Sequence, residues 1–454
     1  MDIKLSRVFY LLVVIGGPLV VAFFCQTLVP ERLQLALLVL AFAVSLFFAT
    51  KDRDRLGFTF GSLSLFLFYI WTLLDQNMAF SNVLTSSMAR SWLIIFGCTL
   101  GISLILGNAR KQEWMSFLWD AMLVIGLFYA VITIVCWLIP GFHDVIYRRF
   151  FSGLQTVVES SDWKAGFTNH YSTNAMYITL GLVACIPLIL KKRLSAVLRY
   201  GALVLLLVAL LLTTKRTHLV SGVASVGFAL CLYGSRQKLS TSFKVIVVAI
   251  IALVGIYASS LYVPDLLGVF ERFSGMQDST SVNDRNTFQA LCLVLWSQSP
   301  IVGNGLGSFA INFNMTGLSA RYIAQGHTIM SAHNCFWQVL AEEGVVGFVL
   351  MVLTFAAFLC GSIRLLLKLN RLAADDHHMR AYLSASIALQ LFFIMYCVTG
   401  NPLYDMQTYV PYLFSCGVYL AIRRVAVESG VLEQWYVRSA RIGSHRMHGD
   451  RVRV

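Results

Sequence analysis

Long apolar stretches make up most of the chain, and their length predicts membrane-spanning helices. Each is roughly 17 to 25 residues long, which is enough to cross a bilayer core about 30 Å thick. Short polar segments separate them, as expected when loops return to water at each membrane surface. We therefore expect twelve spans, at 8–28, 33–50, 57–74, 91–107, 116–139, 174–190, 199–214, 218–234, 245–262, 344–360, 381–399 and 406–422.

The polar segments on one side of the membrane are longer than turns require. Two of them, 141–173 and 262–333, are long loops, and a short polar corner at 213–218 faces the same compartment. No hinge-like linker, low-complexity tract or convincing repeat divides the chain. The predicted fold is thus an all-α polytopic integral membrane protein. It has one membrane domain at 1–422 and a basic tail at 423–454.

The larger loop contains a helical apolar pattern, which predicts a short amphipathic helix on the membrane surface. The apolar residues recur at helical spacing before Pro300 ends the run, and they are Phe288, Leu291, Cys292, Leu295 and Trp296. We expect Asn283 or Asp284 to cap this helix. That start would put Arg285 in the first turn, where free backbone N–H groups and the helix dipole favour an anion.

Two further features follow in the same loop. The glycines at Gly303, Gly305 and Gly307 predict a turn with positive φ rather than a nucleotide-binding loop, because no strand-then-helix unit surrounds them. The pair His333-Asn334 is expected to open the helix that continues into the span at 344–360. His333 would then lie above the membrane surface, between lipid and water.

Composition agrees with the span pattern. The chain is 58% apolar and only 13% charged, whereas about a quarter of a soluble domain is charged. The net charge of +13 lies mainly in the loops and tail that are on the inside if Met1 is cytoplasmic. The positive-inside rule therefore places both termini in the cytoplasm, and the spread of charge excludes nucleic-acid binding. Residues 1–28 are expected to be an uncleaved first span.

The ten cysteines are scattered, with none in a C-x-x-C pair, and most fall inside spans. This pattern is typical of small packing residues and not of a disulfide or metal framework. Outward-facing histidines, His143, His170, His218, His327 and His333, also match no metal-ligand spacing. We therefore expect no metal site and no cofactor.

Several cations face the outside, against the positive-inside bias. Lys215 and Arg216 lie at the short polar corner, where they would either reach lipid phosphates by snorkelling or bind a phosphate-bearing substrate. Arg285 would either pair with Asp284 or Asp278, or form an anion site at its helix start. Arginine suits a phosphate site because its planar fork pairs with phosphate oxygens and keeps its charge.

His333 is the candidate for acid–base chemistry, since histidine is the commonest general base near neutral pH. It is equally compatible with an ordinary polar loop residue. The chain has no P-loop, H-E-x-x-H or G-x-S-x-G motif, so the common soluble-enzyme chemistries have no support. Asp52-Arg53-Asp54 resembles a nucleotide-sugar metal motif, but it falls in a short loop with no nucleotide-binding domain attached.

The order of several short segments resembles the O-antigen ligase and O-antigen polymerase superfamily of bacterial envelope polysaccharide enzymes. The similarity is densest from about 210 to 350. The segments are TTKR at 213–216, RNTFQA at 285–290, WSQSPIVGNG at 296–305, HN at 333–334 and EGVVG at 343–347, with GFTNHYS at 166–172 before the sixth span.

This resemblance implies a glycosyltransferase that uses a glycan linked to undecaprenyl diphosphate and works without metal or nucleotide. Transfer goes to an acceptor hydroxyl on the periplasmic face of the bacterial inner membrane. By resemblance, Arg216 and Arg285 bind the diphosphate, and His333 is the base or orients the acceptor. Lys215, Asn334, Asn169 and His170 are the predicted substrate-binding residues. Lys215 adds a second cation to the family's arginine corner, and His170 has no counterpart that we can assign.

The leading interpretation is an O-antigen ligase, and the alternative is a polymerase. A ligase moves a finished glycan onto lipid A core, whereas a polymerase joins lipid-linked repeat units to a growing glycan. Both use the same donor linkage, so the sequence does not separate them. A protein O-glycosyltransferase is a weaker alternative, because the sequence shows no additional domain outside the membrane that could hold a protein acceptor. A lipid-linked sugar transporter would place polar groups near the bilayer midplane, whereas here they collect on one outer face.

Overall fold

The computed structural model describes residues 5–24, 29–51, 57–78, 83–150, 163–191, 194–233, 280–316, 331–371 and 377–430. These residues form helices and connecting turns, with no strand among them. Asp52-Arg53-Asp54 and His327 lie outside the described residues, so the structure says nothing of them.

The helices coincide with the apolar stretches, which confirms a polytopic membrane protein. Eight described helices are long and apolar enough to cross a membrane, and α4 and α9 contain shorter apolar segments. The total of twelve stays a prediction, because the span expected at 245–262 is outside the described residues. The helices at the expected spans are α1 (Leu5–Leu11), η1 (Leu12–Gly16) and α2 (Gly17–Phe24), which form the first span, then α3 (Glu31–Lys51), α4 (Phe60–Met78), α5 (Val83–Gly107), α6 (Glu113–Leu138), α8 (Tyr171–Lys191), α9 (Ala196–Leu212), α10 (Arg216–Tyr233), α16 (Cys335–Arg371), α17 (His377–Cys397) and α18 (Met406–Glu428).

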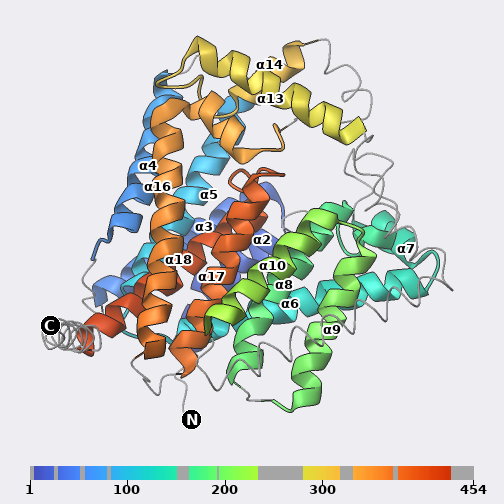
Figure 1. Cartoon of the computed structure of the whole chain (residues 1–454), viewed down its shortest axis with the longest axis vertical. Coiled ribbons are helices and arrows are strands. Elements are labelled where there is room, and N and C mark those ends of the chain that lie inside the picture. The colour runs from blue at the N-terminus through green and yellow to red at the C-terminus, as the bar shows by residue number, and fades with distance from the viewer. Residues whose placement is uncertain are drawn as a thin grey trace, which may run out of the picture.

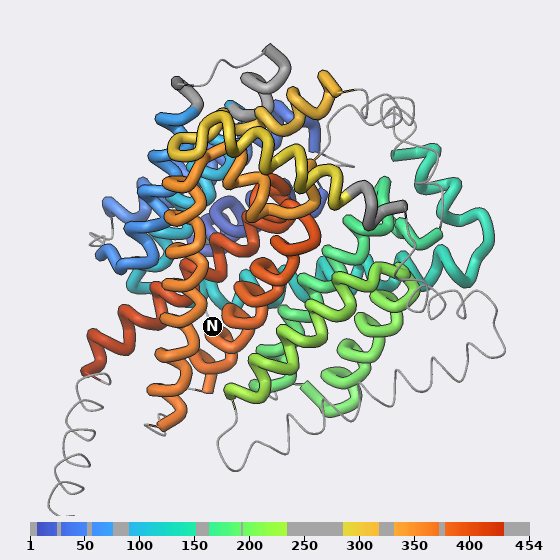
Figure 2. Tube along the Cα trace, turned by 45° about the horizontal axis from the view of Figure 1, so that its top comes forward, coloured from blue at the N-terminus to red at the C-terminus, as the bar shows by residue number. Residues whose placement is uncertain are grey.

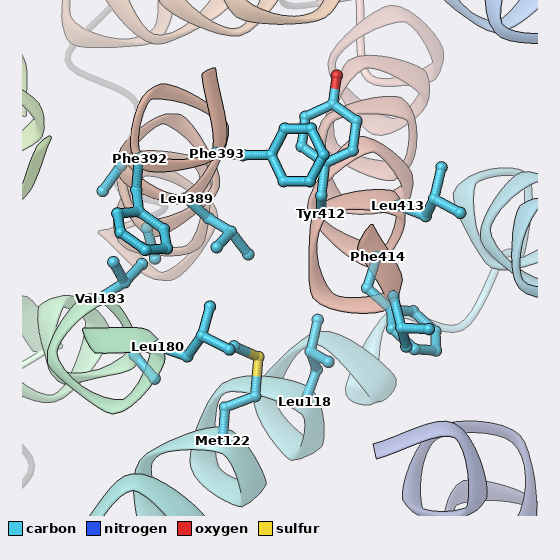
Figure 3. Packing of buried hydrophobic residues seen from close by; sticks show 14 of the residues in the cluster. Leu118, Met122, Leu180, Val183, Leu389, Phe392, Phe393, Tyr412, Leu413 and Phe414 are labelled. Carbon is cyan, nitrogen blue, oxygen red and sulfur yellow. The ribbon is translucent and has the colours of Figure 1, made fainter. Parts of the chain in front are cut away.

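The core lies where α6, α8, α17 and α18 meet. Figure 3 shows side chains from these helices packed together, among them Leu118, Leu180, Phe393 and Tyr412. The rings of Phe393 and Tyr412 stack with centroids 4.2 Å apart. Small residues allow the closest crossing, because a Cβ added at Gly181 would lie 2.6 Å from the Gly126 Cα. Such small-residue contacts let helices pack tightly where water exclusion gives no driving force.

At the end of the bundle that carries α13 (Thr280–Gln298) and α14 (Ser308–Met315), these two helices lie across the top of α16 (Figures 1 and 2). Their apolar faces form a small separate core, in which the rings of Phe288 and Phe313 are 5.3 Å apart. The predicted helix with an apolar face is therefore confirmed, while its place on the membrane surface stays a prediction. Its predicted start is wrong: the helix already includes Thr280, so Arg285 is in the second turn, where its N–H is no longer free.

A break in α16 fixes this outer layer to the bundle. Gly344 has φ 65° and ψ −169°, which interrupts the helix, and the loop before α14 fills the gap with backbone hydrogen bonds. Gly305 N–H donates to the Glu342 carbonyl at 2.8 Å, and Val345 N–H donates to the Pro300 carbonyl at 2.9 Å. Interrupted helices are tolerated at membrane depth only where other protein groups satisfy the backbone.

The glycine turn in this loop is confirmed. Gly303, Gly305 and Gly307 all have positive φ, at 98°, 89° and 88°. Gly303 also needs its missing side chain, since a Cβ there would lie 2.2 Å from the Glu342 carbonyl oxygen. The glycine turn therefore lets the backbone of this loop lie directly against the backbone of α16 at Glu342.

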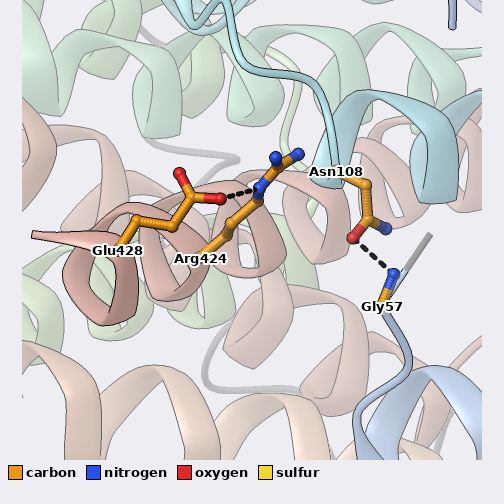
Figure 4. A network of polar contacts seen from close by, with 4 residues as sticks. All are labelled: Gly57, Asn108, Arg424 and Glu428. Carbon is orange, nitrogen blue, oxygen red and sulfur yellow. Dashed lines mark hydrogen bonds and ion pairs between the residues drawn. The ribbon is translucent and has the colours of Figure 1, made fainter. Parts of the chain in front are cut away.

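The loop predicted at 141–173 contributes α7 (Phe142–Phe150) and η3 (Trp163–Ala165). His143 is buried there, with Nδ1 3.1 Å from the Gly166 carbonyl oxygen. At the opposite end of the bundle, Arg424 pairs with Glu428 at 2.7 Å and Gly57 N–H donates to Asn108 at 2.9 Å (Figure 4). These contacts hold the helix ends and carry no chemistry.

Candidate functional site

Three of the predicted cations converge although they come from distant parts of the sequence. Lys215 directly precedes α10, Arg216 is the first residue of that helix, and Arg285 is on α13. Burial first, and then the positive charges of Arg285 and Arg216, together lower the pKa of Lys215 to about 8. The site therefore holds repelling cations in a partly desolvated place, where an anion would relieve the repulsion.

The start of α8 lies against this cation cluster, defined as Lys215, Arg216 and Arg285. Lys215 Nζ is 5.4 Å from the centroid of the Tyr171 ring, within reach of a cation–π interaction. Tyr171 in turn packs on His170, with ring centroids 4.5 Å apart. The structure thus brings His170 to the cluster by way of Tyr171.

The two predicted binding residues at this turn differ in what they offer. His170 Nδ1 accepts a hydrogen bond from Ser172 N–H at 3.1 Å, so its neutral ring carries its proton on Nε2. Asn169 has a buried side-chain oxygen with no hydrogen-bond partner among the described residues. Their roles toward a substrate stay predictions.

Tyr396, near the C-terminal end of α17, is a neighbour of the cation cluster that the sequence pattern did not reveal. It lies beside Ser172, Asp405 and Arg285, and its ring is 4.6 Å from that of His218. It therefore connects α8, α10, α13 and α17. Because Tyr396 falls inside the apolar run at 381–399, its sequence context marks it only as a membrane residue.

Asp405, just before α18, adds an acid to this neighbourhood. Its side chain is exposed to solvent, but the surrounding protein desolvates it enough to raise its pKa to about 6. The charge of Asp405 therefore changes in mildly acidic conditions, whereas an ordinary aspartate is already ionised there.

His333 lies next to α13, on the same side as Arg285. Its ring packs against Phe288 with centroids 6.0 Å apart, and Phe288 is one helical turn beyond Arg285. His333 has φ 52°, and Thr214, next to Lys215, has φ 57°. Among the described residues these are the two non-glycine residues with positive φ, and such strain is typical of functional sites.

Asn334 caps α16. Its side-chain oxygen accepts hydrogen bonds from Phe336 N–H at 3.1 Å and Trp337 N–H at 3.3 Å. This satisfies two donors that a helix start leaves without partners. The structure thus gives Asn334 a structural role, and its predicted part in substrate binding stays a prediction.

The arrangement defines a class of membrane protein with a basic cluster and a histidine at one end of its helices. Within the part of the chain that the structure describes, no three His, Cys, Asp or Glu side chains are placed to hold a metal ion. Residues 201–352, about a third of the chain, match the model of the O-antigen ligase family. This confirms the resemblance to the O-antigen ligase and polymerase superfamily. A search of curated proteins found no match.

The matched region contains the whole cation cluster and His333, whereas Asn169, His170 and Tyr396 lie outside it. By this match the chain is similar to ligase- and polymerase-type membrane enzymes, which carry out glycosyl transfer. Tyr171 of α8 and Tyr396 of α17 contact or neighbour the cation cluster, but they lie outside the matched segment.

Proposed function

We propose that this protein is a periplasmic-face glycosyltransferase of the bacterial inner membrane. It would move a glycan from undecaprenyl diphosphate to an acceptor hydroxyl, as an O-antigen ligase acting on lipid A core. The observation that carries the proposal is the convergence of Lys215, Arg216 and Arg285, which act on one another electrostatically from two separate helices. A diphosphate would relieve the repulsion among these cations, because it brings negative charge to all three.

The chemistry follows from the donor linkage. The acceptor hydroxyl oxygen forms a bond to the anomeric carbon of the sugar, and the bond from that carbon to the diphosphate oxygen breaks. Negative charge then accumulates on the leaving diphosphate, where the cation cluster stabilises it electrostatically. His333 takes the proton of the acceptor hydroxyl as its bond to carbon forms, which makes it the general base.

The proposal is tested in the native host from which the gene has been deleted. Complementation with wild type, Arg285→Ala or His333→Ala is followed by sizing of lipid A-linked and undecaprenyl-linked glycans. Both variants should lose the product of the wild type while inserting in the membrane at normal levels. Arg149→Ala is the matched control, because Arg149 is an exposed arginine on α7. Normal product from Arg285→Ala or His333→Ala would refute the site.

The same profile separates ligase from polymerase. Long glycans that remain on undecaprenyl diphosphate, together with bare lipid A core, would establish the ligase. Loss of long glycans from every pool, with single repeat units persisting, would establish the polymerase instead. Unchanged glycans in all pools of the deletion strain would refute both and leave transport to be tested.

A further inference from the structure

The segment 331–334 presents His333 in a strained backbone conformation, so something must hold it there. Ala332 N–H donates to Gln338 Oε1 at 2.9 Å, and Asn401 Nδ2 donates to the same oxygen. All three residues are almost completely buried. Gln338 therefore joins the residue before His333 to the turn that precedes α18.

A second residue fixes the orientation of the Gln338 amide. Its Nε2 donates to Glu342 Oε1 at 3.1 Å, and the same carboxylate oxygen accepts from Phe309 N–H at 3.2 Å. Glu342 is fully buried, one helical turn beyond Gln338 on α16. Because Nε2 must face Glu342, Oε1 can only face Ala332 and Asn401.

We infer that Gln338 and Glu342 are positioning residues that hold His333 in its working orientation, which rests on the proposed role of His333. Positive φ is uncommon for residues other than glycine, so the segment will relax if the Ala332 N–H loses its acceptor. A further hydrogen bond, from Cys335 N–H to the Gly400 carbonyl at 3.1 Å, keeps the start of α16 in place but does not restrain Ala332.

This role predicts a specific kinetic effect. The donor diphosphate is held by the cation cluster, whereas the hydrogen bonds of Gln338 and Glu342 reach Ala332, Asn401 and Phe309. Loss of Gln338 should therefore leave donor binding intact and lower only the rate of transfer. A displacement of about 1 Å at a reacting group costs up to about a hundredfold in rate.

The first experiment compares purified Gln338→Leu with wild type in transfer assays with a lipid-linked donor. We expect kcat to fall by about tenfold to a hundredfold, with KM for the donor within about twofold. Gln390→Leu is the matched control, because Gln390 is also a fully buried glutamine with two side-chain hydrogen bonds, on α17. A similar fall in the control, or a kcat within about twofold of wild type in Gln338→Leu, would overturn the inference.

A conservative pair of variants separates positioning from general packing. Glu342→Gln keeps an oxygen that accepts from Gln338 and Phe309, so it should keep at least about half of the wild-type kcat. Glu342→Leu removes that oxygen and should match Gln338→Leu. Equal loss in both Glu342 variants would show that the carboxylate itself is required, which contradicts a positioning role.

A readout without glycosyl transfer distinguishes failure of this inference from failure of the proposed function. Diethyl pyrocarbonate modifies histidine rings, and mass spectrometry follows the rate at His333 with His170 as the internal reference. The His333 rate should change at least about threefold in Gln338→Leu and stay unchanged in Gln390→Leu. An unchanged His333 rate overturns the positioning role. A changed rate in a protein whose wild type transfers no glycan would refute only the proposed function.

Discussion

Replacing Lys215 with methionine should make the protein more stable while it weakens donor binding. The difference between an ordinary lysine pKa of 10.5 and about 8 corresponds to about 3 kcal/mol of unfavourable charging. Lys215 is partly exposed, and solvent screening reduces this to about 2 kcal/mol. Loss of the cation–π contact with Tyr171 costs about 0.5–1 kcal/mol. The net gain for Lys215→Met is therefore about 1 kcal/mol near neutral pH.

The stability advantage of Lys215→Met over wild type should decrease as the pH rises. Because the folded protein has the lower lysine pKa, the unfolded chain binds more protons between about pH 8 and 10.5. Wild-type stability therefore rises with pH across this window, while Lys215→Met shows no such rise. The advantage of the variant is complete below about pH 8 and disappears toward pH 10.5.

Thermal unfolding of the purified protein in detergent measures this directly. Lys164→Met is the matched control, because Lys164 Nζ also lies over an aromatic ring, that of Trp163 at 5.5 Å, but outside the cation cluster. We expect that control to lose stability. Lys215→Arg should keep the wild-type charge and gain nothing. A Lys215→Met variant that is no more stable than wild type, or whose advantage is the same at pH 7 and pH 10, would refute the electrostatic reasoning.

Three further predictions concern other parts of the site. Desolvation by the surrounding protein raises the pKa of Asp405 to about 6, so wild-type stability should fall as pH rises from about 4 to 6. A pH titration of thermal unfolding should show this slope disappear in Asp405→Asn. Gly344→Ala should sharply reduce the folded yield measured by size-exclusion chromatography, because its Cβ would lie 2.3 Å from the Ile301 carbonyl oxygen, whereas Gly201→Ala, in open space, should not. Asn334→Ala removes a helix cap and should lower the free energy of unfolding, measured by denaturant titration, by about 1 kcal/mol. Asn334→Asp keeps a capping oxygen and should retain most of the stability that the cap contributes.

Patterns along the sequence predicted the helices and the cations for clear physical reasons. Apolar runs of bilayer length have one stable structure in lipid, so the spans could be located without knowing how they pack. Lys215, Arg216 and Arg285 stood out because they oppose the positive-inside bias. The predicted start of α13 was wrong because cap-forming residues are common in polar segments, and Asn283 and Asp284 lie inside the helix.

The remaining site features depend on contacts between distant segments. Tyr396 and Gln338 look like ordinary span and helix residues until α8, α13 and the 401–405 turn pack around them. The break at Gly344 is equally hidden, since the sequence predicts one helix that continues into the span at 344–360, and only the loop at 300–305 explains the break. Contacts between distant segments leave no periodic pattern in the local sequence, so they could not be predicted from it.

The backbone exchange at Gly344 makes two parts of the chain dependent on each other during synthesis. The loop at 300–305 emerges first, and its donors on Asn304 and Gly305 have no acceptors until Ala341 and Glu342 follow. The layer formed by α13 and α14 therefore reaches its final contacts with α16 only after residues 341 and 342 have been synthesised. A chain that stops before residue 341 would lack both acceptors and would leave the loop at 300–305 without these contacts to α16.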